Sequence, residues 1–213
     1  MIKPALLVFD LDGTLYRTAS SFLPTMRRVF EQYGVDGPSD ELIMGQVGEP
    51  FSAFLDWAID RGLPRDRDAL ARTISYAEYA SIRERGELFP GVLETLRLFK
   101  ASGHAIAICT NGDQRYVGVI LEKFGIGDLF DAIRTHEDEK KTKTEMIAEL
   151  RDQWPDRTAF VIGDRYHDVQ AGIANGCVVV AAAYGYAKPG ELSDADHLIE
   201  RFGDLAEIVG EST

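Results

Sequence analysis

The sequence predicts an α/β protein with a doubly wound parallel-sheet core and an inserted helical cap after the first strand. Four short apolar runs are continuous rather than alternating, which is typical of strands buried on both faces of a parallel sheet. They read ALLVFD (5–10), AIAICTN (105–111), AFVIGD (159–164) and CVVVAAAYG (177–185). Helical patterns lie between them, and this alternation favours right-handed crossovers onto both faces of one sheet.

The segment after the first strand does not follow the alternation. Its patterns are helical over 23–34, 39–62 and 66–86, and the chain re-enters the core at ELFPGV (87–92). Roughly seventy residues are far more than a βαβ crossover needs. We therefore predict an α/β core of residues 1–15 and 87–213, and a helical cap domain of residues 16–86 that lies over the strand ends and closes on a ligand.

Local signals place the remaining elements. A further strand is expected around FDAIRTH (130–136), and helices are expected over 90–103, 114–125, 143–154 and 168–176. The first of these helices runs into a glycine, which commonly ends a helix.

Composition limits the classes of partner. The 213 residues carry a net charge of −12, whereas nucleic acids and anionic membranes are bound by basic surfaces. The two cysteines, Cys109 and Cys177, lie in apolar stretches, which favours buried thiols and a reducing, cytoplasmic location. The first residues lack the features of a secretion signal. The sequence is compatible with a monomer or a homodimer.

Polar residues stand where the predicted strands end. One run ends at Asp10, the next at Thr110 and Asn111, and a third at Asp164. Ligands of open parallel sheets bind in the crevice outside the carboxyl ends of the strands. We therefore expect these side chains to meet at one site.

The residue types at this edge favour phosphoryl transfer. Asp10, Asp12 and Asp164 offer only oxygen ligands, which suit Mg²⁺, and such close carboxylates would repel one another without a cation. The Thr110 hydroxyl and the lysines of KKTKTEM (140–146) are suited to bind phosphoryl oxygens. A carboxylate is also able to act as the nucleophile and form an aspartyl-phosphate.

Four motifs, in this order, resemble those of the haloacid dehalogenase superfamily. They are DLDGTL (10–15), CTNG (109–112), a lysine that opens a helix, and VIGDRYHDVQAG (161–172). The segments 89–111, 185–192 and 195–209 are similar to its capped, phosphoglycolate phosphatase-like branch. The resemblance covers nearly the whole chain and implies Mg²⁺-dependent hydrolysis of a small phosphorylated metabolite. The second aspartate, Asp12, disfavours dehalogenation, because the dehalogenases lack it.

The resemblance also implies a role for each matching residue. Asp10 would attack phosphorus, and Asp12 would protonate the leaving alcohol and then activate water, while its backbone carbonyl binds the metal. In full, it implies catalytic roles for Asp10, Asp12, Thr110 and Lys143, substrate contacts for Asn111 and Lys141, and metal binding by Asp10, Asp12, Asp164 and Asp168.

Two questions stay open at the level of sequence. Lys143 fits the family pattern in KTEMI and is preferred, while Lys141 fits the register of the more common K-P-x-P motif, whose prolines are missing here. A phosphosugar mutase with the same aspartyl-phosphate is the alternative function, and a non-catalytic phospho-acceptor module is a more distant one. No pattern among the cap residues indicates a particular substrate. Four of the cap arginines, Arg27, Arg28, Arg83 and Arg85, are expected on solvated helix faces.

Overall fold

A six-stranded parallel sheet forms the core of the computed structural model, which describes residues 3–136 and 141–211. The strand order is β3-β2-β1-β4-β5-β6, so β1 lies between β2 and β4. The strands are β1 (Leu6–Phe9), β2 (Ala105–Thr110), β3 (Ala132–Thr135), β4 (Ala159–Gly163), β5 (Val178–Ala182) and β6 (His197–Ile199). After β3 the chain crosses to the other side of β1, and this change of direction creates the crevice in which such sheets bind ligands.

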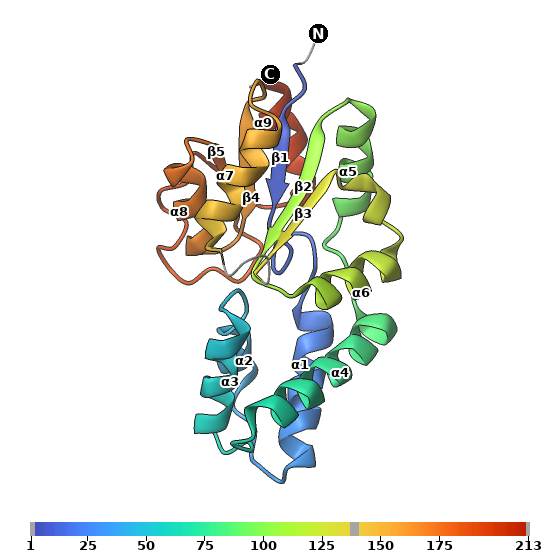
Figure 1. The fold of residues 1–213 in the computed structure, drawn as a ribbon, viewed down its shortest axis with the longest axis vertical. Helices are drawn as coiled ribbons and strands as arrows, with labels where there is room; N and C mark the ends of the chain where they lie inside the picture. Colours follow the sequence, from blue (N-terminus) through green and yellow to red (C-terminus); the bar gives the residue numbers. More distant parts are fainter. Residues whose placement is uncertain (1–2, 137–140, 212–213) are drawn as a thin grey trace.

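Helices cover both faces of the sheet, as the continuous apolar runs predict. Leu7 and Phe9 belong to a hydrophobic cluster with one set of helices, while Leu6 and Val8 belong to a second cluster on the opposite face. The first set comprises α5 (Val92–Ala101), α6 (Gln114–Phe124) and α9 (Leu205–Glu211), and the second comprises α7 (Lys143–Gln153) and α8 (Tyr166–Ala174). Figure 1 shows this doubly wound core above a separate helical lobe.

The core contains short elements for which the sequence patterns give no signal. Strand β6 pairs in parallel with β5, and the 3₁₀ turns η1 (Gly127–Leu129) and η2 (Phe202–Asp204) are also present. A three-residue strand is too short for a period to be recognised. The expected strand around 130–136 is confirmed as β3, at the edge of the sheet.

The lower lobe is built from helices α1 (Ala19–Gln32), α2 (Asp40–Met44), α3 (Phe51–Asp60) and α4 (Arg67–Arg85). It has its own hydrophobic cluster, which includes Phe30, Phe54 and Ile74. The helical pattern over 39–62 is two helices, because the turn between them contains Gly48 with φ of 87° and is followed by Pro50.

Two neighbouring stretches of backbone connect the lobes. The Arg17 N–H donates to the Glu87 carbonyl at 2.9 Å, and Tyr16 pairs with Leu88 in an antiparallel bridge. The division into a core and a cap domain at 16 and 86 stays a prediction, since packing does not show that the two parts are separate folding units. Among the described residues, no helix has both the length and the apolar character that a membrane crossing requires.

Candidate active site

Three neighbouring strands deliver polar side chains to one edge of the sheet. Asp10 follows β1, Thr110 ends β2 and Asp164 follows β4, and these strands are adjacent in the order β2-β1-β4. Asp10 and Thr110 line a cavity of about 110 Å³ that is closed from the other side by the helical lobe. Asp12, Asn111, Lys143 and Asp168 also line it, so the structure brings most of the sequence-predicted site residues together.

Three buried carboxylates form a tight cluster at this edge. Asp10, Asp164 and Asp168 each place an oxygen within 4.8 Å of the others. Burial raises the pKa of Asp10 to about 7, and repulsion from Asp168 and Asp12 adds to the rise while Lys143 opposes it. Burial and the charges of Asp10 and Asp168 also raise the pKa of Asp164 well above its usual value. Such hard, anionic oxygen donors fit a divalent cation, which would relieve their repulsion.

Lys143 lies between two of these carboxylates. Its Nζ is 2.6 Å from Asp10 Oδ1 and 2.5 Å from Asp168 Oδ1. Burial opposes the charge of this lysine, but the two aspartates raise its pKa above the usual value, so it stays protonated. A capping box of Thr142 and Glu145 starts α7 just before Lys143, which sets the lysine at the first helical position.

Lys141 lies outside the cavity. Its Nζ forms an ion pair with Glu149, which Arg134 also contacts at 3.2 Å. Of the two candidate lysines, Lys143 is therefore the one in contact with the carboxylates at the strand ends. The neighbouring Lys140, also part of the motif, lies outside the described residues.

The side chain of Asp12 is hydrogen-bonded to hydroxyl groups and is not one of the three clustered carboxylates. Its Oδ1 accepts hydrogen bonds from the hydroxyls of Tyr116 at 2.5 Å and Thr18 at 2.7 Å. Burial raises the pKa of Asp12, with these hydrogen bonds acting against the rise. Its charge still acts on Asp10, and a metal contact through the backbone carbonyl of Asp12 stays a prediction.

A tight turn places Asp164 close to the loop after β1. Tyr186 N–H donates to Asp164 Oδ2 at 2.6 Å, and the Thr14 hydroxyl donates to Oδ1 at 3.4 Å. Gly13 has φ of +82°, and a Cβ at this position would lie 2.1 Å from Asp164 Oδ2. A glycine is required here both by the backbone conformation and by the close approach of the carboxylate.

The other predicted residues hold local structure. Thr110 Oγ1 accepts a hydrogen bond from Gly112 N–H at 3.1 Å, and Asn111 Nδ2 donates to the Gly48 carbonyl of the cap at 2.9 Å. Asp168 Oδ2 accepts from Arg165 N–H at 3.0 Å, so Asp168 caps α8 as well as contacting Lys143. The part that Asn111 plays in substrate binding stays a prediction.

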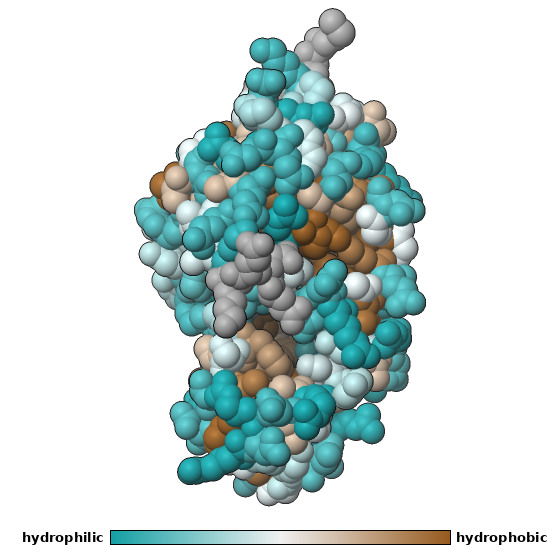
Figure 2. All heavy atoms as spheres, viewed as in Figure 1, coloured by the Kyte–Doolittle hydropathy of each residue, from teal (hydrophilic) through white to brown (hydrophobic). Residues whose placement is uncertain are grey.

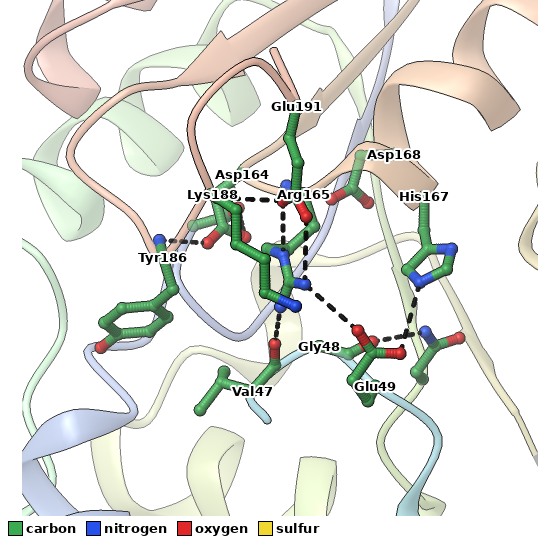
Figure 3. Close-up of polar contacts among 12 residues, drawn as sticks. Val47, Gly48, Glu49, Asp164, Arg165, His167, Asp168, Tyr186, Lys188 and Glu191 are labelled. Atoms are coloured by element: carbon green, nitrogen blue, oxygen red, sulfur yellow. Dashed lines mark hydrogen bonds and ion pairs between the residues drawn. The ribbon is translucent and has the colours of Figure 1, made fainter. Parts of the chain in front are cut away.

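The sequence analysis missed Arg165, which joins the two lobes (Figure 3). Its guanidinium donates to the Val47 carbonyl in the loop between α2 and α3, and it pairs with Glu49 at 3.2 Å and with Glu191 at 2.8 Å. His167 lies beside it at the cavity wall, 3.7 Å from Glu49. The position of Arg165 inside the fourth motif was the available signal, but its cap partners lie more than a hundred residues away in the chain.

The sequence analysis also missed Glu78, a cap residue that lines the cavity from α4. Burial raises its pKa to about 8, and the charges of Asp12 and Asp113 add to the effect. No sequence pattern marks this position, because Glu78 lies in a helix rich in charged residues.

A family model described as "haloacid dehalogenase-like hydrolase" matches residues 7–182. The chain belongs to this family. Among haloacid dehalogenase-like relatives, a phosphoglycolate phosphatase of Haemophilus influenzae is 27% identical over 96% of this chain and 97% of its own. One of Pseudomonas putida is 30% identical over 86% of this chain and 71% of its own.

Solved structures of haloacid dehalogenase-like proteins share the fold. A predicted phosphoglycolate phosphatase of Haemophilus somnus matches with a TM-score of 0.85 and 26% identity, over 96% of this chain and 97% of that one. A protein of Thermotoga maritima with the provisional name beta-phosphoglucomutase has a TM-score of 0.79 and 18% identity, over 98% of this chain and 100% of that one. The doubly wound fold predicted from the sequence is therefore confirmed, with helices inserted after the first strand.

Proposed function

We propose that the protein hydrolyses a small phosphomonoester with the help of Mg²⁺, through an aspartyl-phosphate on Asp10. That the chain is a phosphatase follows from its family and its relatives. The observation that carries the finer proposal is the environment of Asp10, a buried carboxylate held by Lys143 at 2.6 Å at the floor of a cavity. Phosphoglycolate, from the names of the relatives, is one member of this substrate class.

In the first step an Asp10 oxygen attacks phosphorus and the bond to the leaving alcohol breaks. Thr110 and Lys143 bind the phosphoryl oxygens, whose charge they stabilise. Asp12 donates its proton to the leaving oxygen, and its raised pKa favours the protonated form that this step needs. Tyr116 and Thr18 keep the carboxyl of Asp12 in place.

In the second step water attacks the phosphorus of the aspartyl-phosphate, and Asp10 leaves as a carboxylate. Asp12, now ionised, takes the proton from this water, so it returns to the state in which it started. Asp10, Asp164 and the Asp12 carbonyl would hold Mg²⁺, with Asp168 as a further ligand or as the group that orients Lys143. Bound Mg²⁺ would offset the charge of the carboxylates and of the phosphoryl group.

The setting of the reaction follows from the same proposal. We expect a small phosphorylated metabolite as the partner and a cytoplasmic location, with the two cysteines as buried free thiols. A mutase would use the same aspartyl-phosphate. The similar structure from Thermotoga maritima that is named as a mutase is only 18% identical, so its likeness concerns the fold and not the activity. Product analysis separates the two, because only a hydrolase releases inorganic phosphate from a single sugar phosphate.

The test of the nucleophile is Asp10→Asn, measured as phosphate release from a generic aryl phosphate with Mg²⁺. We expect turnover to fall by more than about three orders of magnitude, because an amide is a very poor nucleophile. Asp152→Asn on the exposed face of α7 makes the same chemical change away from the site and should keep full activity. Retention of a tenth of the activity by Asp10→Asn would exclude the aspartyl-phosphate on this residue.

A further inference from the structure

The cavity wall formed by the cap is apolar and aromatic. Phe22, Phe51 and Phe54 line it, with the rings of Phe51 and Phe54 stacked at 5.9 Å and those of Phe22 and Phe54 edge to face at 5.3 Å. In the space-filling view a hollow lies between the lobes, with brown, hydrophobic atoms visible below it (Figure 2). Because Asp10 and Lys143 are on the opposite, core side, this wall faces the alcohol part of a substrate rather than its phosphoryl group.

Carboxyl side chains outnumber basic ones among the residues that line this cavity. Glu49, Glu78 and Asp113 line the cavity in addition to the aspartates of the site. Two described side chains of permanent positive charge line it as well, and both are already paired: Lys143 with Asp10 and Asp168, and Arg165 with Glu49 and Glu191.

The four cap arginines considered in the sequence analysis do not line this cavity. Arg27 pairs with Asp40, and Arg27, Arg28 and Arg85 line a separate groove on the lobe. Arg83 lies 3.9 Å from Glu122 on a solvent-exposed face. Lys143 and a bound divalent cation would offset the charge of the phosphoryl group, whereas the two permanent cations among the described lining residues are already paired with carboxylates of the chain.

The surroundings of Glu78 indicate how this wall affects a negatively charged group. Glu78 is only 8% exposed, and burial together with the charges of Asp12 and Asp113 raises its pKa to about 8, so this wall keeps the carboxyl mostly uncharged at neutral pH. A carboxylate carried by the substrate would enter the same surroundings and would lose its water in the same way.

We infer that the alcohol part of the substrate carries no negative charge and presents apolar surface to the aromatic wall of the cap. This inference rests on the proposed function and specifies the substrate class of that site. It separates the chain from a phosphoglycolate phosphatase, because phosphoglycolate carries a carboxylate on its alcohol part. Phosphomonoesters of neutral or amine-bearing alcohols with an alkyl or ring portion fit the cavity.

The experiment compares kcat/KM for matched pairs of phosphomonoesters. The pairs are benzyl phosphate with 4-carboxybenzyl phosphate, and the neutral amide of phosphoglycolate with phosphoglycolate itself. We expect the wild type to prefer the neutral member of each pair by about tenfold or more, because like charges at short range repel strongly in a site of low dielectric. An equal or higher kcat/KM for the carboxylated members would overturn the inference.

A variant tests whether this wall causes the discrimination. Glu49→Gln removes one carboxylate and leaves Arg165 less fully paired, so the preference for the neutral member should shrink. Glu84→Gln, near the end of α4 with a side chain 70% exposed, makes the same change outside the cavity and should leave the preference unchanged. An unchanged preference in Glu49→Gln would overturn the assignment to this wall.

Two readouts keep the inference separate from the proposed function. Competitive inhibition by inorganic phosphate should be the same in the wild type and both variants, which shows that the phosphoryl site is intact. Absence of hydrolysis for every phosphomonoester would remove the proposed function and this inference with it. Asp10-dependent hydrolysis with a preference for the carboxylated members would overturn the inference alone.

Discussion

At the residue scale, Lys143 contacts Asp10 at the end of β1 and Asp168 in the first turn of α8. It lies at 2.6 Å from Asp10 and 2.5 Å from Asp168, with both contacts buried. Lys141, two residues earlier, is in an ion pair with Glu149 away from the cavity. The start of α7 between them, at Thr142, separates two lysines that the sequence does not distinguish.

Replacing each lysine tests this difference. We expect Lys143→Ala to lower kcat by about two to three orders of magnitude, the typical effect of losing one donor that stabilises the charge of a transition state. Lys141→Ala should behave nearly as the wild type, as most substitutions away from a site do. The measurement is steady-state hydrolysis of an aryl phosphate, with circular dichroism to show that both variants are folded. Severe loss in Lys141→Ala with normal turnover in Lys143→Ala would contradict the assignment.

At the scale of elements, the loop between α2 and α3 connects the cap to the core. Asn111 donates to the Gly48 carbonyl, and Arg165 contacts the Val47 carbonyl and Glu49 while pairing with Glu191 of the core (Figure 3). A second connection is the hydrogen bond from Ala19 N–H to the Tyr186 hydroxyl at 3.0 Å. The loop is therefore held over the cavity by polar contacts, whereas α4 also packs on the core, since Tyr79 and Ile82 belong to the same hydrophobic cluster as Leu7 and Phe9.

Arg165→Ala should loosen this loop. Because the guanidinium is buried, its loss leaves Glu191 and the Val47 carbonyl without their partner, at a cost of about 3 kcal/mol in the free energy of unfolding. Urea unfolding measures this cost, and limited proteolysis shows whether residues 45–50 become more susceptible. Arg17→Ala is the control, since its ion pair with Glu87 is 56% exposed on each side and should contribute less than about 1 kcal/mol. Equal costs for the two variants would contradict the role of Arg165.

At the scale of the whole molecule, the fold concentrates negative charge at one end of the sheet. The chain has a net charge of −12, and three of its buried aspartates lie within 4.8 Å of one another. The pKa of Asp10 is raised from 3.8 to about 7, so the folded, metal-free protein binds a proton that the unfolded chain has already lost in this range. The contribution of Asp10 to the free energy of unfolding therefore falls as the pH rises from about 4 to 7.

Stabilisation by Mg²⁺ should grow over the same pH range. A cation binds the ionised carboxylates and competes with protons, so the rise in melting temperature on addition of Mg²⁺ should be larger at pH 8 than at pH 5.5. Asp164→Asn keeps an acceptor for the Tyr186 N–H but removes one charged ligand, and its Mg²⁺-dependent shift should be much smaller. Asp152→Asn should shift as the wild type does. An equal Mg²⁺ effect at both pH values would argue against metal binding by this cluster.

The sequence by itself determined the parts of the protein that depend on local signals. Continuous apolar runs such as ALLV and AFVI predict buried parallel strands, and aspartates directly after Phe9 and Gly163 predict a site at the strand ends, because neighbouring parallel strands end on the same side of a sheet. The long helical insertion was also predictable, since its length exceeds that of any simple crossover.

Only the tertiary structure decided which side chains face the cavity from the cap and which lysine reaches the strand ends. Glu78 interacts electrostatically with Asp12, and Arg165 donates to the Val47 carbonyl, across long stretches of chain. Both interactions depend on how a helix or loop packs rather than on its own sequence. The helical pattern indicates which face of α4 is apolar, but it does not indicate which residues of that helix line the cavity. The core motifs are recognisable from local sequence, whereas the cap wall of the cavity is assembled from segments that lie far apart in the chain. The proposed substrate class therefore depends on the folded structure.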